Sequence, residues 1–247
     1  LKLYPMNRKT FLSTSLSIIG VSIWPDSWKN LGYPTPILLG KGNPELYSID
    51  IPLLKPVGVA FKEMQHSAEK EGIVLEIVSG YRSFERQKSI WNRKYKSNQK
   101  EGLKPNENIN KIIEYSTLPG TSRHHWGTDV DLIDGSKVKV GDVLLTEKFH
   151  GMGPYVKMRK WMEKNAANYG FIMPYTKDKS RKGFYYEPWH FSYSPIALPM
   201  LKAYLELDLK SILSTTEVEG SLHLSSNFMA LYLEQNILGI TKELKAF

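Results

Sequence analysis

The sequence predicts an α+β domain in which a small antiparallel sheet is packed with helices. Two short segments alternate polar and apolar residues, which is the pattern of strands with one buried face. Helical periodicity marks other segments, and the order of strands and helices is not the regular βαβ alternation of a parallel sheet. At 247 residues the chain is long enough to bury one sizeable core.

The alternating segments define the two faces of the expected sheet. In TDVDLI, Val130 and Leu132 share one face, whereas Asp129 and Asp131 share the other. The stretch YYEPWHFSY alternates in the same way, with aromatic residues opposite polar ones: Trp189, Phe191 and Tyr193 against His190 and Ser192. A further strand is expected over residues 73–80, where β-branched residues end at a glycine. We therefore expect a core on one face of the sheet and a polar site on the other.

Other segments have the apolar spacing of amphipathic helices, namely residues 56–72, 84–95, 154–169, 200–212 and 227–238. Pro56 stands in a favoured first-turn position, Ser83 can cap the second helix, and Gly170 ends the third. Residues 96–118 are polar and lack a clear period, so they predict a long loop.

The chain has no cysteine and an excess of basic residues. Disulfides, thiolate nucleophiles and zinc–cysteine sites are therefore excluded, and a transition-metal site must use His, Asp or Glu. The net charge is +8, and residues 80–115 and 148–182 each hold nine Lys and Arg, against four and two acids. Such segments suit an anionic cell wall, or a solvated surface without a partner. No recognition helix or aromatic RNA-binding strand accompanies the charge, so no nucleic acid partner is expected.

The first 25 residues have the pattern of an export signal. Arg8 and Lys9 precede a mostly apolar run over residues 11–24 that is too short and too rich in serine for a stable membrane span. NRKTFL is similar to the twin-arginine signal, with Lys9 in place of the second arginine. The alternative is an amphipathic N-terminal helix, because no small-x-small cleavage site follows. We expect an exported protein, periplasmic or associated with the cell wall.

Histidines and aspartates on the polar face of the sheet could hold a metal ion. A hydrolytic zinc site has three protein ligands and leaves a fourth position for water. Asp131 and His190 can supply two ligands if their strands are neighbours, and a histidine from the turn before Gly127 can supply the third. His124 and His125 both satisfy this spacing. The alternative for EPWH is a strand start with a buried tryptophan and a hydrogen-bonded histidine.

Glu187 stands three positions before His190, with Pro188 between them. The proline makes a continuous helix unfavourable, so the glutamate lies at the start of the strand. Because strand residues three apart face opposite ways, Glu187 is a poor ligand beside His190. It is better placed as a base that overhangs the metal from the preceding loop.

The stretch SGYRSFERQ combines a strand end, a turn and the start of a helix. Arg82, in the turn, could offer a fork of donors to a carboxylate, or form an ordinary surface ion pair. Gln87 shares a helical face with Phe84 and Trp91, so it is either a buried hydrogen-bonding residue or a substrate contact.

Together the three segments resemble the VanY-type D-alanyl-D-alanine carboxypeptidases, within the wider group of zinc peptidases that includes lysostaphin-like enzymes and the hedgehog domain. The family pattern S-x-H-x-x-G-x-A-x-D falls on residues 122–131, E-x-W-H on residues 187–190, and S-G-Y-R-S with a following Gln on residues 79–87. The order and wide spacing of the motifs also match. Asp129 departs from the pattern, because it occupies the position of the family's alanine.

The resemblance implies one zinc ion per chain and a role for each motif residue. These roles are three zinc ligands, a catalytic base and three substrate contacts: His124, Asp131 and His190; Glu187; and Arg82, Ser122 and Gln87. Arg82 would grip the terminal carboxylate of the substrate. His125 then lies outside the ligand set, and Asp129 could hydrogen-bond a ligand histidine.

The activity that the resemblance implies is removal of the terminal D-Ala from peptidoglycan stem peptides. An L,D-carboxypeptidase or a peptidoglycan endopeptidase would use the same site, and residues 96–118 could decide between them. A non-catalytic zinc-containing module is a third alternative, but a structural zinc site needs neither the base Glu187 nor the clamp Arg82. We expect a peptidase domain over residues 26–205 and a C-terminal helical extension, residues 206–247, packed on it.

Overall fold

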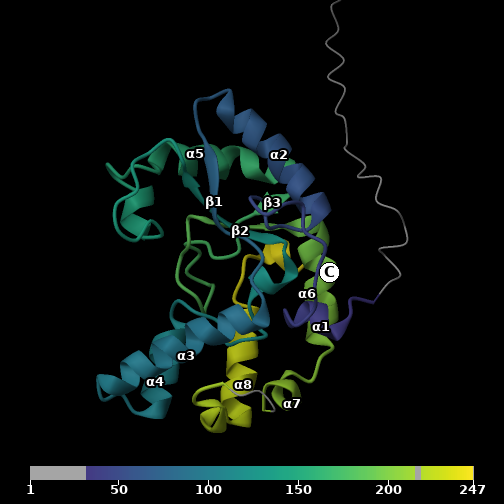
Figure 1. Ribbon diagram of the computed structural model, residues 1–247, viewed down its shortest axis with the longest axis vertical. Coiled ribbons are helices and arrows are strands. Elements are labelled where there is room, and N and C mark those ends of the chain that lie inside the picture. The colour runs from purple at the N-terminus through teal and green to yellow at the C-terminus, as the bar shows by residue number, and fades with distance from the viewer. Residues whose placement is uncertain (1–31, 215–217, 247) are drawn as a thin grey trace, which may run out of the picture. The chain divides into compact units, whose positions relative to one another are not determined.

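The computed structural model describes residues 32–214 and 218–246, and these contain a four-stranded antiparallel sheet (Figure 1). Its strands, in the spatial order β1-β2-β4-β3, are β1 (Leu75–Ser79), β2 (Asp129–Asp134), β4 (His190–Tyr193) and β3 (Phe171–Ile172). The predicted α+β class with a small antiparallel sheet is confirmed. The described residues from Tyr33 onward form one compact unit. The expected signal, residues 1–25, lies outside the described residues, and the boundaries at residues 25 and 205 stay predictions.

Strand β2 is buried on both faces. Val130 and Leu132 lie in the core, as their alternation predicts, but Asp129 and Asp131 are buried as well. The expectation of a half-buried strand was therefore wrong for β2. A turn of 3₁₀ helix, η2 (Arg123–Trp126), packs on β2, and its own residues are buried. The polar face of the strand is thus enclosed by protein and does not lie open to solvent.

Helices surround the sheet. They are α1 (Thr35–Leu38), α2 (Lys55–Glu69), α3 (Phe84–Lys100), α4 (Pro105–Ile113), α5 (Val156–Asn165), α6 (Ser194–Leu205), α7 (Leu209–Ser214) and α8 (Ser226–Tyr232). In Figure 1, α2 and α5 lie at one end of the sheet, and α3, α4 and α8 lie at the other. Ser83 caps α3 as predicted, because its side chain accepts a hydrogen bond from the Arg86 backbone N–H at 3.2 Å.

Helix α4 lies where the sequence predicted a long loop, so that expectation was wrong. Its contact with α3 includes two asparagines, whose polar side chains hid the helical period. Asn98 donates to Asn108 at 2.9 Å, and Asn108 donates to the Tyr95 carbonyl at 2.8 Å, both inside the protein. Ile109 and Ile112 supply the apolar part of the same buried face.

The helix predicted over residues 200–212 is two helices in the structure. Helix α6 begins at Ser194 and ends at Leu205, and α7 begins at Leu209. Asp208 accepts a hydrogen bond from the Ser211 backbone N–H at 3.0 Å, which is the contact that starts a new helix. The short elements α1 and β3 were not predicted, because four and two residues are too few to show a period.

The C-terminal part of the chain supports the segments that carry the candidate site. Trp91, in α3, donates to the Glu219 carbonyl at 2.9 Å. The Tyr232 hydroxyl accepts from the Leu118 backbone N–H at 3.0 Å and contacts the Thr121 hydroxyl at 2.9 Å. These two bonds fix the segment that enters η2. Among the described helices, none has both the length and the apolar character of a membrane span.

Gly127 turns the chain from η2 into β2. Its φ is 66°, in the left-handed region that favours glycine, and its carbonyl accepts from the Leu54 backbone N–H at 2.9 Å. A Cβ atom at this position would lie 3.2 Å from Leu54 Cγ and 3.3 Å from Leu54 N. The turn that presents His124 and the strand that presents Asp131 therefore depend on a glycine here.

We predict that Gly127→Ala lowers the free energy of unfolding by more than the ~1–2 kcal/mol that a left-handed L-residue costs. The excess comes from crowding against Leu54. The matched control is Gly141→Ala, because Gly141 has a φ of 59° and nothing lies within 4 Å of a Cβ atom there. This variant should lose only the free energy that the left-handed backbone conformation costs. Urea unfolding of both variants tests this, and an equal loss in the two would contradict it.

Candidate metal centre

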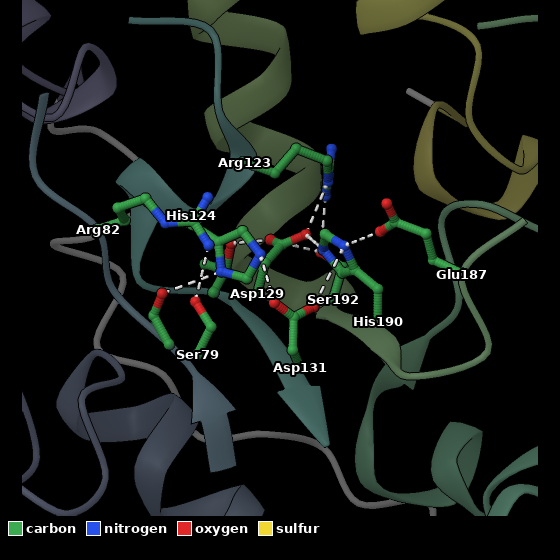
Figure 2. A network of polar contacts seen from close by, with 11 residues as sticks. Ser79, Arg82, Arg123, His124, Asp129, Asp131, Glu187, His190 and Ser192 are labelled. Atoms are coloured by element: carbon green, nitrogen blue, oxygen red, sulfur yellow. Dashed lines mark hydrogen bonds and ion pairs between the residues drawn. The ribbon is translucent and has the colours of Figure 1, made fainter. Parts of the chain in front are cut away.

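Three side chains from separate elements converge at the buried end of a pocket (Figure 2). His124 comes from η2, Asp131 from β2 and His190 from β4, and one ligand atom of each lies within 4.8 Å of the others. Asp131 and His190 face each other directly in the register of β2 with β4. The condition that their strands be neighbours is therefore met.

The ring nitrogens of the two histidines are divided between Asp131 and the surrounding protein. His124 Nε2 lies 3.4 Å from Asp131 Oδ2, and His190 Nδ1 lies 3.6 Å from Asp131 Oδ1. The opposite nitrogens face acceptors: His124 Nδ1 lies 2.9 Å from the Gly80 carbonyl oxygen, and His190 Nε2 lies 3.0 Å from Asp129 Oδ1. The Gly80 carbonyl requires an N–H on His124 Nδ1, which leaves the lone pair of His124 on Nε2, toward Asp131. His190 faces a carboxylate at each nitrogen, because Nδ1 also lies 2.9 Å from Glu187 Oε2, so a metal ion at Nδ1 would take the place of a proton.

Asp131 also has the features of a metal ligand. Its Oδ1 atom is buried and has no hydrogen-bond partner among the described residues. A buried carboxylate oxygen without a partner costs free energy, and a cation at this point would satisfy it. Two imidazoles and one carboxylate are a donor set that suits zinc. The residues present thus fit a divalent ion of that kind.

Acidic residues surround the imidazole of His190. Burial by itself would lower the pKa of His190, but hydrogen bonds to Asp129 and Glu187 and the charge of Asp131 raise it to about 10. Burial raises the pKa of Asp131 to about 6. Burial, with the charges of Arg82 and His190, lowers the pKa of His124 well below its usual value. The acidic residues around His190 therefore favour a positive charge at its imidazole, which a proton or a metal ion can supply.

His125 faces away from this group. Its Nε2 accepts from the Gly120 backbone N–H at 3.0 Å, and its Nδ1 lies 2.6 Å from the Arg82 carbonyl oxygen. The ring is fully buried, and burial lowers its pKa to about 4. His125 thus connects two loops in its neutral form, and the structure groups His124 with Asp131 and His190.

Glu187 and Arg82 line the same pocket as the three candidate ligands, as does Ser122. Glu187 lies in the loop before β4, as predicted, and its Oε2 is 2.9 Å from His190 Nδ1. Arg82 donates to Gln87 Oε1 at 3.0 Å and to Ser79 Oγ at 2.9 Å, both neutral groups. No acid among the described residues forms an ion pair with Arg82, so these two contacts hold its charge in place without neutralising it.

Gln87 is fully buried and is not among the residues that line the pocket. It accepts from Arg82 and donates to the Thr117 carbonyl at 2.8 Å. Of the two alternatives for Gln87, the contacts match the buried hydrogen-bonding residue. A role for Gln87 as a substrate contact stays a prediction.

Sequence reasoning did not assign three residues that surround the centre. Tyr175 places its ring edge-on to His190, with centroids 5.0 Å apart, and lines the pocket. Nothing in the sequence near Tyr175 signals this. Arg123 and Ser192 bond to Asp129 behind His190. Strand alternation placed Ser192 on the polar face of the sheet, but it did not predict the hydrogen bond from Ser192 to Asp129.

Comparisons with known proteins agree with this geometry. The sequence profile of the VanY family, described as D-alanyl-D-alanine carboxypeptidase, matches residues 51–196, and the chain belongs to this family. YodJ of Bacillus subtilis (strain 168) is 36% identical over 140 residues, which are 56% of this chain and 45% of that protein. A D-alanyl-D-alanine carboxypeptidase of Enterococcus faecium is 32% identical over 156 residues, 62% of this chain and 41% of that protein.

A solved structure shows the same fold. VanYB in complex with D-Alanine-D-Alanine superposes with a TM-score of 0.50 at 21% identity, covering 72% of this chain and 92% of that chain. The chain studied here spans less than half of the length of the two relatives named above.

We predict that His124→Ala and His125→Ala have different consequences. His124→Ala should abolish tight binding of a divalent metal. His125→Ala should leave the metal site in place but lower the free energy of unfolding by about 2–6 kcal/mol, because it leaves the Gly120 N–H and the Arg82 carbonyl without their partner at ~1–3 kcal/mol each. Metal titration and urea unfolding of both variants measure this. Loss of metal binding only in His125→Ala would contradict the assignment.

Proposed function

We propose that the chain is a zinc-dependent carboxypeptidase that removes the terminal D-Ala from peptidoglycan stem peptides. One observation carries this proposal: a base, Glu187, and a cation, Arg82, line the same pocket as the three-residue metal group. A merely structural metal site needs neither. The motif match and the family membership support the same reaction.

His124, Asp131 and His190 would hold the zinc ion. When bound there, zinc would polarise the scissile carbonyl and lower the pKa of a water molecule. The protein's contribution is to fix the donors: a backbone carbonyl orients His124, and the β2–β4 register sets Asp131 opposite His190. The donors therefore need little rearrangement to bind the ion.

Glu187 is the proposed general base. Its carboxylate faces the pocket beside His190 and has a side-chain exposure of 15%, so it is reached from the pocket but largely shielded from bulk water. It would take a proton from the attacking water and deliver that proton to the leaving amine. With no cysteine in the chain, no thiolate intermediate is available, and direct hydrolysis is the simplest route.

Arg82 is the proposed clamp for the free C-terminal carboxylate of the substrate. Two of its guanidinium nitrogens donate to Gln87 and Ser79, which holds the group without neutralising it. A carboxylate that enters the pocket would meet a preoriented cation. Ser122, which is buried at the pocket wall, would add a hydroxyl contact to the peptide. A clamp of this kind gives the enzyme exopeptidase character.

Peptidoglycan lies in the cell wall, so the proposed reaction takes place there. This location agrees with the export signal expected in residues 1–25. The basic segments 80–115 and 148–182 would favour contact with an anionic wall. The pocket has a volume of about 740 Å³, within the range of roughly 300–1,000 Å³ that holds a drug-sized ligand. It therefore has room for more of the stem than a terminal dipeptide.

We predict that wild-type protein loaded with zinc releases one alanine from pentapeptide muropeptides, and that Glu187→Gln lowers kcat by about 10²–10⁴-fold, because the proton acceptor is lost. Mass spectrometry of the products measures both. The zinc content of the variant, which should match wild type, is the control. Other cleavage products would identify an L,D-carboxypeptidase or an endopeptidase, and no cleavage of any muropeptide would contradict the proposal.

We predict that Arg82→Met raises KM and lowers kcat/KM for pentapeptide by about ten- to a hundredfold, the equivalent of one charge-assisted contact of ~1.5–3 kcal/mol. Arg86→Met is the matched control, because Arg86 is exposed in the first turn of α3, just after the turn that holds Arg82, and does not line the pocket. Steady-state kinetics test this with pentapeptide and with its C-terminal amide. If wild type cleaves the amide as well as the acid, Arg82 is not a carboxylate clamp.

A further inference from the structure

Asp129 lies behind His190, at the position where the family pattern has alanine. Its Oδ1 atom is 3.0 Å from His190 Nε2, on the side of the ring away from Asp131 (Figure 2). The residue has no solvent exposure, and its carboxylate is held on every side. The chain therefore has a carboxylate at a position where the family pattern has the methyl group of alanine.

The carboxylate of Asp129 accepts hydrogen bonds from three further side chains. Arg123 Nε donates to Oδ1 at 2.8 Å, Ser192 Oγ donates to Oδ2 at 2.9 Å, and Thr128 Oγ1 donates to Oδ2 at 2.7 Å. Arg123 also donates to Ser192 Oγ at 2.6 Å. These bonds leave the carboxylate a single orientation, with one oxygen aimed at His190.

The sheet register fixes this arrangement relative to the metal group. Asp129 pairs with Ser192, and Asp131 pairs with His190, on the same face of β2 and β4. The ring of His190 thus spans two successive cross-strand pairs, with Nδ1 toward Asp131 and Nε2 toward Asp129. Tyr175 packs edge-on to the ring, and the ring of His124 lies 4.8 Å away.

A stabilising role alone does not account for the pair of Asp129 and Arg123. Removing two charges from water costs about as much as their attraction returns, so apolar side chains would stabilise the fold as well. Arg123 also offsets the charge of Asp129, so the carboxylate adds little net charge to the centre. What it does provide is an acceptor at one fixed point beside His190 Nε2.

We propose that Asp129, held by Arg123 and Ser192, is a positioning residue that fixes the tautomer and orientation of His190 so that Nδ1 faces the metal. Asp129 accepts the hydrogen bond from Nε2–H and so keeps the proton on Nε2. Nδ1, which lies 2.9 Å from Glu187 Oε2, is then the nitrogen at which a metal ion would replace a proton. This inference rests on the proposed zinc site, and it assigns a function to the position at which the chain departs from the family pattern.

The test is the zinc dissociation constant of the full chain, measured by competition with a chromophoric chelator. Asp129→Ala should raise the dissociation constant by about 10–100-fold, which is the usual effect of losing such a partner. Asp129→Asn keeps an oxygen acceptor and should recover part of the affinity. The absorption spectrum of the cobalt(II)-substituted protein should change in Asp129→Ala, because the His190 ring is no longer fixed.

The matched control is Asp134→Ala. Asp134 is equally buried on the same strand and accepts three hydrogen bonds, from the Val74 and Ser136 backbone N–H groups and the Ser136 hydroxyl, but it does not contact His190. Asp134→Ala should lower the free energy of unfolding and leave the zinc dissociation constant unchanged. The comparison separates positioning of the ligand from general support of the fold.

An unchanged dissociation constant and cobalt spectrum in Asp129→Ala would overturn the inference, as would equal losses in Asp134→Ala. If Asp129→Ala does not fold, Asp129→Asn decides. A zinc affinity and cobalt spectrum equal to those of wild type, or a loss of affinity that Asp134→Asn matches, would then overturn the inference. If the wild-type protein binds no zinc, the proposed function is contradicted. That result can be distinguished from a failure of the inference about Asp129, which needs a wild-type protein that binds zinc.

Discussion

The antiparallel pairing of β2 with β4 is the constraint on which the site depends. Asp131 faces His190 and Asp129 faces Ser192, while the pair between them, Val130 and Phe191, points into the core. Because side chains alternate along a strand, a slip of one residue would move the polar set into the core and the apolar set into the pocket. Core packing and site geometry therefore specify the same register.

The sequence alone predicted the two strands of the site and most of its residues. Strand alternation identified the two site strands and their polar residues, and the motif supplied the partner turn. Spacing could not separate His124 from His125, because both lie in η2 and differ only in the direction of their rings, toward Gly80 in one case and Gly120 in the other. Helix α4 was missed because an asparagine, Asn108, occupies part of its buried face, where it pairs with Asn98 of α3.

The centre concentrates charges and buried polar groups that the fold does not need. Two imidazoles, several carboxylates and two guanidinium groups lie around one pocket, and burial shifts the pKa of Asp131 upward and that of His124 downward. Such groups are costly to bury without partners, and strongly perturbed pKa values of this kind concentrate at functional sites. The C-terminal contacts through Glu219 and Tyr232 support the segments that hold the cluster together.

The central claim is that the β2–β4 register and the η2 turn build one zinc site in which each donor atom is already selected. Anomalous diffraction from zinc-loaded crystals tests it most directly. The account predicts one anomalous peak per chain, coordinated by His124 Nε2, an oxygen of Asp131 and His190 Nδ1, with His190 Nε2 still bonded to Asp129. A zinc ion bound through His125, or through His190 Nε2, would contradict it.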